Sequence, residues 1–271
     1  MPFPVSGRVI YEQNPLQQVI CQLNFPQILR IQAAVPDAYQ DAIRVDFPLF
    51  EESADQFLSP TIEVTPALRN AFRSFNLNLG RKAYVFATAD STVTITLTQD
   101  SISLKTTAYR RWEDFHSTLT SAVEPFIKIY EPAFYSRVGS RYIDVISRQK
   151  LALADIPWKA LLKPHVAGEF TDDNAARAIE TAARESLINL SNDGDSADPI
   201  GKVILRHGLG VVDQTQESCF YIDVDLYTES QTPLHEADSI LHTFNRKAGN
   251  LFRWCISDRL RDALRPTPVP E

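Results

Sequence analysis

Two long amphipathic helices are the strongest constraint that this sequence places on its fold. Apolar residues recur in alternating steps of 3 and 4 between Trp112 and Ile129, and again between Leu234 and Cys255. This spacing places one continuous apolar stripe along each helix. Because such a stripe is costly to leave in water, each helix is expected to cover a sheet face. The stripes comprise Trp112, Phe115, Leu119, Ala122, Phe126 and Ile129, and Leu234, Ala237, Leu241, Phe244, Ala248, Leu251 and Cys255.

Alternating apolar and polar runs precede each helix and predict antiparallel strands. They cover residues 83–88, 92–98 and 101–107 before the first helix, and 202–212 and 218–228 before the second. Strand runs with helices appended are typical of the α+β class, so we predict antiparallel β-sheets packed by the two long helices.

The similar order of strands and helix in both parts of the chain suggests two structurally similar halves. We therefore divide the chain into an N-terminal α+β half, residues 1–150, and a C-terminal α+β half, residues 151–271. No residue-level repeat is visible, so the duplication is a hypothesis about structure alone.

Local signals predict the remaining features. Residues 171–184 are rich in alanine and are expected to form a helix capped by Thr171 or Asp172. Thr232 is expected to cap the last long helix, with a proline next to it in the first turn. Pro125 is expected to kink or divide the first long helix. The proline-rich tail, residues 265–271, is expected to be disordered.

A central strand, residues 135–146, carries the first candidate site. Side chains alternate faces along a strand, so Arg137, Gly139 and Arg141 share one face. Two guanidinium groups on one face can hold a carboxylate or phosphate, and the glycine between them permits a close approach. The alternative is ion pairing with acidic residues of a neighbouring strand. We favour a structural role for Arg141 and ligand binding for Arg137.

Asp223 and Asp225 form the second candidate site, on a strand whose alternate residues are apolar. Two carboxylates about 6.6 Å apart on one strand face could bind one metal ion or act as acid and base. The competing interpretations are a solvated face or ion pairs with Arg137 and Arg141. Because a bare Asp-x-Asp pattern is a weak signal for catalysis, we favour these structural interpretations.

Metal and cofactor signatures are absent from the sequence. His235 and His242 lie seven residues apart on one predicted helix, which is too far for one zinc ion without ligands from other elements. The sequence has no dinucleotide fingerprint, no Walker loop and no Gly-x-Ser-x-Gly elbow. We therefore expect no metal and no cofactor, and we lean against an enzyme without excluding one.

Composition narrows the classes of partner and location. Residues 1–150 carry 15 Lys and Arg against 15 Asp and Glu, whereas residues 151–271 carry 12 against 19, a net charge of −7. A general nucleic-acid binder usually has a basic surface, so nucleic acid is disfavoured. No apolar run reaches the roughly 18 residues that span a bilayer, and we see no signal peptide. Three widely spaced cysteines fit reduced thiols, so we expect a cytoplasmic protein without a membrane partner.

Several motifs together resemble a sporadically distributed family of uncharacterised bacterial proteins. They are Tyr11-x-x-x-Pro15-Leu16-x-x-Val19, Phe47-Pro48, Trp112-x-x-Phe115, Arg137-Val-Gly-x-Arg141-Tyr142-Ile143-Asp144, Asp223-x-Asp225 and Phe244. The chain departs from the family at Ser140, where leucine is usual, and at Asp144, where asparagine is usual. The resemblance brings no activity, but the patchy distribution implies mobile elements or accessory systems such as phage defence.

These observations give three functional hypotheses. The leading one is a non-enzymatic binding module for a protein partner or a small anionic ligand, with Arg137 and Arg141 as ligand-binding candidates. The first alternative is a metal-dependent hydrolase that uses Asp223 and Asp225, and the second is a nucleic-acid-binding protein. The oligomeric state is left open, a homodimer included.

Overall fold

The computed structural model describes residues 3–53, 62–63, 82–191, 199–212 and 217–269. Its strands are β1 (Val9–Tyr11), β2 (Leu16–Asn24), β3 (Leu49–Ser53), β4 (Ile62–Glu63), β5 (Ala83–Ala87), β6 (Val93–Thr98), β7 (Ser101–Thr106), β8 (Arg137–Ser147), β9 (Ala182–Ser191), β10 (Pro199–Val212), β11 (Glu217–Tyr227) and β12 (Pro266–Pro268). Its helices are α1 (Leu29–Ala33), α2 (Asp37–Ile43), α4 (Trp112–Tyr130), α5 (Trp158–Leu161), α6 (Pro164–Ala167), α7 (Asp173–Ala178), α8 (Ala237–Cys255) and α9 (Asp258–Ala263), with the 3₁₀ helices η2 (Gly168–Thr171) and η3 (Leu234–Glu236).

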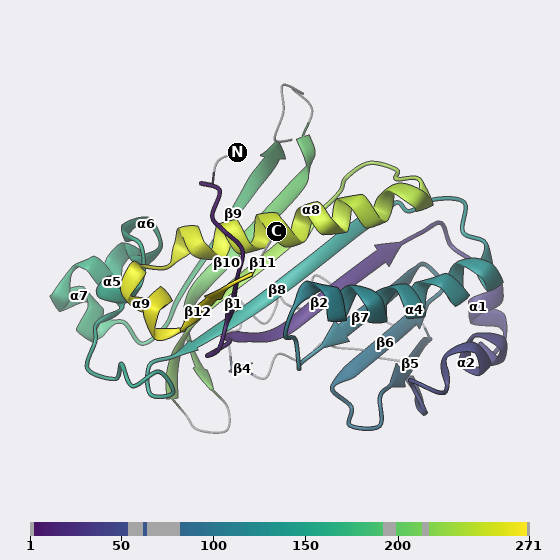
Figure 1. Ribbon diagram of the computed structural model, residues 1–271, viewed down its shortest axis with the longest axis horizontal. Helices are drawn as coiled ribbons and strands as arrows, with labels where there is room; N and C mark the ends of the chain where they lie inside the picture. The colour runs from purple at the N-terminus through teal and green to yellow at the C-terminus, as the bar shows by residue number, and fades with distance from the viewer. Residues whose placement is uncertain (1–2, 54–61, 64–81, 192–198, 213–216, 270–271) are drawn as a thin grey trace.

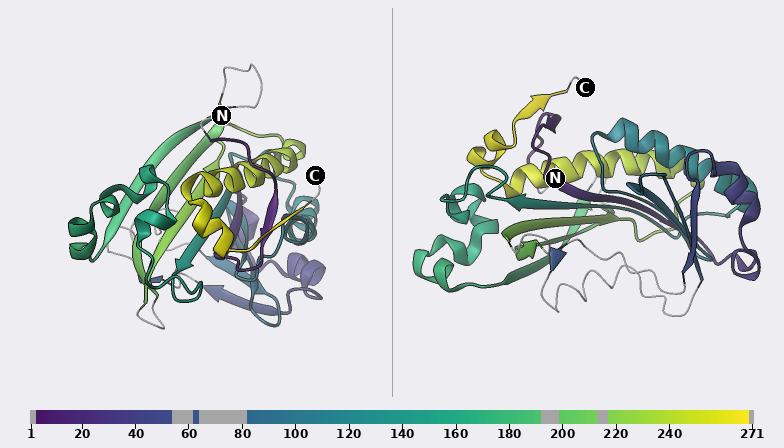
Figure 2. Two further views of the ribbon diagram at one scale, coloured as in Figure 1. Left: turned by 60° about the vertical axis from the view of Figure 1, so that its left-hand side comes forward. Right: turned by 90° about the horizontal axis from the view of Figure 1, so that it is seen from below.

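One antiparallel sheet runs through the molecule, with both long helices on the same face (Figures 1 and 2). Its strand order is β3-β5-β6-β7-β2-β8-β11-β10-β4, and β9 also pairs with β10. This is the predicted α+β architecture. The expected stripes lie in the core, where Leu119 and Phe126 of α4 and Phe244 of α8 are buried. Phe126, for example, packs 4.8 Å from the ring of Phe25.

The order of elements that follows β2 in the chain is similar to the order that follows β8, its neighbour in the sheet. After β2 come short helices, the short strands β3 and β4, the meander β5-β6-β7 and then α4; after β8 come short helices, the meander β9-β10-β11 and then α8. In the sheet, β7 flanks β2 as β11 flanks β8. The duplication and the division at residue 150 stay predictions. In the order of elements above, β8 is the counterpart of β2, whereas the division at residue 150 assigns β8 to the first half.

Two local predictions differ from the structure, and a third, the cap at Asp172, is confirmed. The helix expected over 171–184 ends at Ala178, and Ala182 already lies in β9, because pairing with β10 outweighs the helix propensity of alanine. Its cap is Asp172, whose carboxylate accepts from the amides of Asn174 and Ala175. Thr232 does not cap α8; its backbone pairs with Tyr135 instead, and a 3₁₀ turn precedes the helix.

Two further expectations concern prolines. Pro125 lies within α4 but does not divide it, because Ala122 and Phe126 hold the helix on the sheet on both sides of the missing N–H. The tail expected to be disordered contains β12, which pairs with β1. Figure 2 (right) shows both strands on the side of α8 that faces away from the large sheet. Residues 270–271 fall outside the described part of the chain.

No helix in the described part of the chain has both the length and the apolar character needed to cross a bilayer. Each of the three cysteines is buried as a free thiol.

Candidate functional site

The register of β8 and β11 decides which candidate side chains meet. Arg141 lies opposite Asp225, and Ile143 lies opposite Asp223. Because faces alternate along a strand, both arginines and both aspartates point to the sheet face away from α4 and α8. Apolar residues such as Val138 occupy the helix-covered face. The predicted alternation therefore brings the two candidate pairs together on one polar face.

Arg141 and Asp223 form a buried two-point ion pair. The guanidinium donates from Nε to Oδ1 and from Nη2 to Oδ2, both at 2.7 Å, and the residues are 1% and 0% exposed. Arg206 of β10 adds a longer contact to Asp223 Oδ2 at 3.4 Å and donates to Glu185 of β9 at 2.7 Å. A buried carboxylate that is ion-paired in this way has a structural role in the sheet.

Arg137 makes a weaker and more accessible pair with Asp225. A single nitrogen, Nη2, lies 3.2 Å from Oδ1 and 3.5 Å from Oδ2, and the arginine side chain is 24% exposed. The guanidinium also lies over the ring of Tyr227, 4.6 Å from its centroid. Burial raises the pKa of Asp225, and the neighbouring guanidiniums of Arg137 and Arg141 oppose that rise. The two pairs therefore differ in distance, geometry and exposure.

Gly139 makes the position of Arg137 possible. A Cβ at residue 139 would lie 2.5 Å from Nη1 of Arg137, closer than side-chain atoms approach one another. The space left by the missing side chain of Gly139 is therefore filled by the guanidinium of Arg137, which folds back along its own strand.

The aspartates are poorly placed to bind a metal ion. Both Asp223 and Asp225 contact guanidinium groups. A divalent cation there would sit beside positive charges and would have to break these ion pairs. The geometry gives the hydrolase alternative no support.

Asp144 is a third buried carboxyl group, on the helix-covered face of β8. It lies opposite Ile222 and is 4% exposed. Burial raises its pKa well above the ordinary value of 3.8, and the charge of Asp223 adds to the rise. An ionised carboxyl group at this position would therefore destabilise the folded state.

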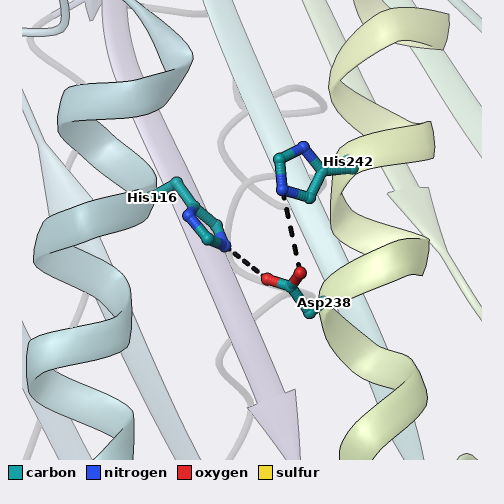
Figure 3. Close-up of side chains that lie close together, drawn as sticks. All are labelled: His116, Asp238 and His242. Carbon is teal, nitrogen blue, oxygen red and sulfur yellow. Dashed lines mark hydrogen bonds and ion pairs between the residues drawn. The ribbon is translucent and has the colours of Figure 1, made fainter.

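A second cluster lies between the two long helices. His116 of α4 and Asp238 and His242 of α8 converge, with one potential ligand atom from each within 4.8 Å of the others (Figure 3). Nε2 of His116 contacts Oδ1 of Asp238, and Nε2 of His242 lies 3.7 Å from Oδ2. His116 is partly buried, and the other two residues are exposed.

Trp112 packs against both imidazoles of this cluster. Its ring centroid lies 5.3 Å from that of His116 and 5.2 Å from that of His242, and its indole N–H donates to Nδ1 of His242 at 2.8 Å. An indole N–H can only donate, so Nδ1 of His242 is the acceptor and its Nε2 carries the proton.

Sequence reasoning missed this cluster because its residues come from two helices. His235, which was considered together with His242, is exposed and lies near Glu236 rather than in the cluster. The signal that could have found part of it is Asp238-x-x-x-His242, which places two ligand types on one face of a helix. The position of His116 follows only from the docking of α4 beside α8.

Comparisons with known proteins do not add a family to these observations. No protein-family model matches the sequence, and a search of curated proteins also finds no match. The geometry of the two clusters is therefore the basis on which a function is proposed.

Proposed function

We propose that the protein is a non-enzymatic binding module that recognises an anionic group, a carboxylate or a phosphate, through Arg137. The observation that carries this proposal is the contrast between the two arginines of β8. Arg141 is fully buried in a two-point pair, whereas Arg137 is partly exposed and contacts Asp225 through one nitrogen at longer distances.

An incoming anion can compete with Asp225 for Arg137. A carboxylate or phosphate can meet the guanidinium with two parallel hydrogen bonds, a stronger geometry than the single-nitrogen contact with Asp225. Tyr227 supports the face of the guanidinium and holds its plane in place, which lowers the entropy cost of binding. The buried Arg141–Asp223 pair next to it keeps the strands in register.

The anionic group could belong to a small molecule or to a protein. A protein partner is favoured by β9, which carries exposed side chains along most of its length, including Leu187 at 59% exposure. A long exposed strand at one side of a sheet offers a partner both backbone and apolar contacts. The net charge of −7 disfavours nucleic acid as the bearer of the phosphate.

Thermal melts with defined anions test the proposal. Inorganic phosphate and citrate serve as small probes and a glutamate-rich peptide as a protein-borne carboxylate, each compared with chloride at equal ionic strength. At ten times its Kd, a ligand stabilises the folded protein by about 1.4 kcal/mol. We expect at least one probe to raise the Tm of the wild type and the rise to vanish in Arg137→Ala.

Arg30→Ala is the matched control, because Arg30 also lies over a tyrosine ring, that of Tyr130 at 4.9 Å, but away from the polar sheet face. It should respond like the wild type, which also corrects for the general stabilising effect of phosphate. An equal response of Arg137→Ala and the wild type, or no response to any probe, contradicts the proposal. A response to the peptide alone identifies a protein partner.

A further inference from the structure

We propose that His116, Asp238 and His242 form a binding site for a divalent transition metal ion, zinc being the best fit, which links α4 to α8. Two imidazoles and one carboxylate are a donor set that zinc and its neighbours in the first transition row accept. This site is separate from Arg137 and does not depend on the proposed anion binding.

The spacing of two of the potential ligand atoms is close to that of a zinc site. Zinc holds nitrogen at about 2.0–2.1 Å and oxygen at about 2.0–2.2 Å, so ligand atoms of a tetrahedral site lie about 3.3–3.5 Å apart. The distance between Nε2 of His242 and Oδ2 of Asp238, 3.7 Å, is too long for a hydrogen bond and close to this spacing. The three ligand atoms fall within 4.8 Å of one another, and none of these residues is fully buried.

The backbone already holds two of the ligands together. Asp238 and His242 stand one turn apart on the same face of α8, so their side chains meet without any change in the helix. His116 reaches across from the first turns of α4 (Figure 3). Three protein ligands leave a fourth position to water, as in zinc sites that remain open to solvent.

The hydrogen bond from Trp112 to His242 opposes metal binding at this site. Its N–H bond to Nδ1 of His242 places the imidazole proton on Nε2, the nitrogen that faces Asp238. To bind metal through Nε2, His242 must shift that proton to Nδ1, where it meets the indole N–H. Metal binding therefore breaks the Trp112 bond, weakens the site by the value of one hydrogen bond, and changes the surroundings of the indole.

This proposal departs from the sequence expectation of no metal, which considered histidines of one helix only. The competing possibility is a metal-free bridge in which Asp238 is hydrogen-bonded to His116 and lies within ion-pair distance of His242. The two cases differ in their response to added metal and to the removal of Trp112.

The experiment uses the full chain without an affinity tag, stripped with chelator, and titrated with zinc chloride. We expect one equivalent to bind, to raise the Tm and to alter tryptophan fluorescence. Cobalt(II) should give the visible absorption of a tetrahedral site. All responses should be lost in His116→Ala and in Asp238→Ala. His235→Ala should keep them, because His235 is an exposed histidine near the same end of α8 but outside the cluster.

Trp112→Phe sharpens the test. Removal of the opposing N–H should tighten zinc binding about threefold to tenfold, since a hydrogen bond of this kind is worth about that factor. A wild type without zinc-dependent change in Tm, or a change that persists in both His116→Ala and Asp238→Ala, overturns the proposal. The first result leaves the cluster as a hydrogen-bonded bridge, and the second places the ion elsewhere.

Discussion

The two charged clusters of this molecule lie on opposite sides of the same sheet and are built in different ways. In the buried cluster, Arg141, Asp223 and Arg206 come from adjacent strands, and the register of the strands fixes which charges meet. In the exposed cluster, His116 and His242 come from two helices that dock on the other face. The buried charges neutralise one another and keep the strands in register, whereas the potential ligand atoms that converge at the surface can bind a metal ion. The mutations below test this distinction, beginning with the largest expected effect.

Arg141→Ala should be the most damaging change, with a loss of about 3–5 kcal/mol in the free energy of unfolding. It removes both 2.7 Å hydrogen bonds from Asp223, which is fully buried and retains from Arg206 only the 3.4 Å contact. Urea unfolding measures the loss. Arg111→Ala is the control, because Arg111 and its partner Asp114 are half exposed and their pair should be worth less than about 1 kcal/mol. Equal effects of both variants would show that the buried pair does not hold the sheet.

Phe244→Ala should cost about 3–5 kcal/mol and Leu119→Ala about 2–5 kcal/mol. Both side chains lie in the core beneath the helices that carry the exposed cluster. Their loss leaves cavities that the sheet cannot fill. Thermal and urea melts of the metal-free protein provide the measurement, and melting like the wild type would mean that apolar packing does not hold α4 and α8.

Asp144→Asn should stabilise the protein at neutral pH relative to the wild type, because it removes a buried group that can ionise. Burial disfavours the ionised form of Asp144 in the folded state and raises its pKa well above 3.8, whereas the unfolded chain ionises near that value. As the pH rises from about 4, ionisation therefore favours unfolding until the folded pKa is reached. Wild-type stability should thus fall relative to that of the variant between pH 4 and pH 7. Parallel stability curves for the two proteins over this range would contradict a raised pKa.

Gly139→Ala should lower the free energy of unfolding by about 1 kcal/mol, because the buried Asp225 loses its contact with Arg137, and it should abolish the anion response assigned to Arg137. The new methyl group would lie 2.5 Å from Nη1, so the flexible end of Arg137 must move away from Asp225. Anion-dependent melts measure the response. This variant keeps the arginine and changes only its position, so a retained response would mean that anion binding does not need the observed geometry.

His242→Ala should have the smallest effect in the absence of metal, a loss within about 1 kcal/mol, because the side chain is exposed. With zinc present, the difference from the wild type should grow by the binding free energy of the ion. A large loss without metal would instead make the cluster a structural bridge between the helices.

Sequence reasoning predicted the parts of this structure that depend on periodicity. The stripes through Leu119 and Phe244 identified the helices, and alternation placed Asp223 and Asp225 on one face. It also offered pairing with Arg137 and Arg141 as one interpretation, which the structure contains. It did not find β9, because Ala182 and its neighbours have the local propensity of a helix and become a strand only by pairing with β10.

The exposed cluster could not be predicted from the sequence, for a different reason. His116 and His242 are 126 residues apart in sequence, and only the docking of two helices on one sheet makes them neighbours. Periodicity gives the buried face of each helix, but it does not give the offset between the helices along the sheet. Strand alternation limits the partners of Arg141 to residues on one face of the sheet. The partners of His116 depend on the offset between α4 and α8 along the sheet.

The pairing of β1 with β12 bears on how this chain folds during synthesis. Val9 pairs with Pro268, and the segment before β1 packs on α8, where Phe3 contacts Trp254 and Ser6 bonds to Asn250. A ribosome adds about 5–20 residues per second, so roughly 250 intervening residues take about 13–50 s. For that time β1 lacks its partner strand, although Arg8 can already pair with Glu113 of α4. The sheet can begin to form around β2 and β7, but the pairing of β1 with β12 can form only after α8 and β12 have been translated.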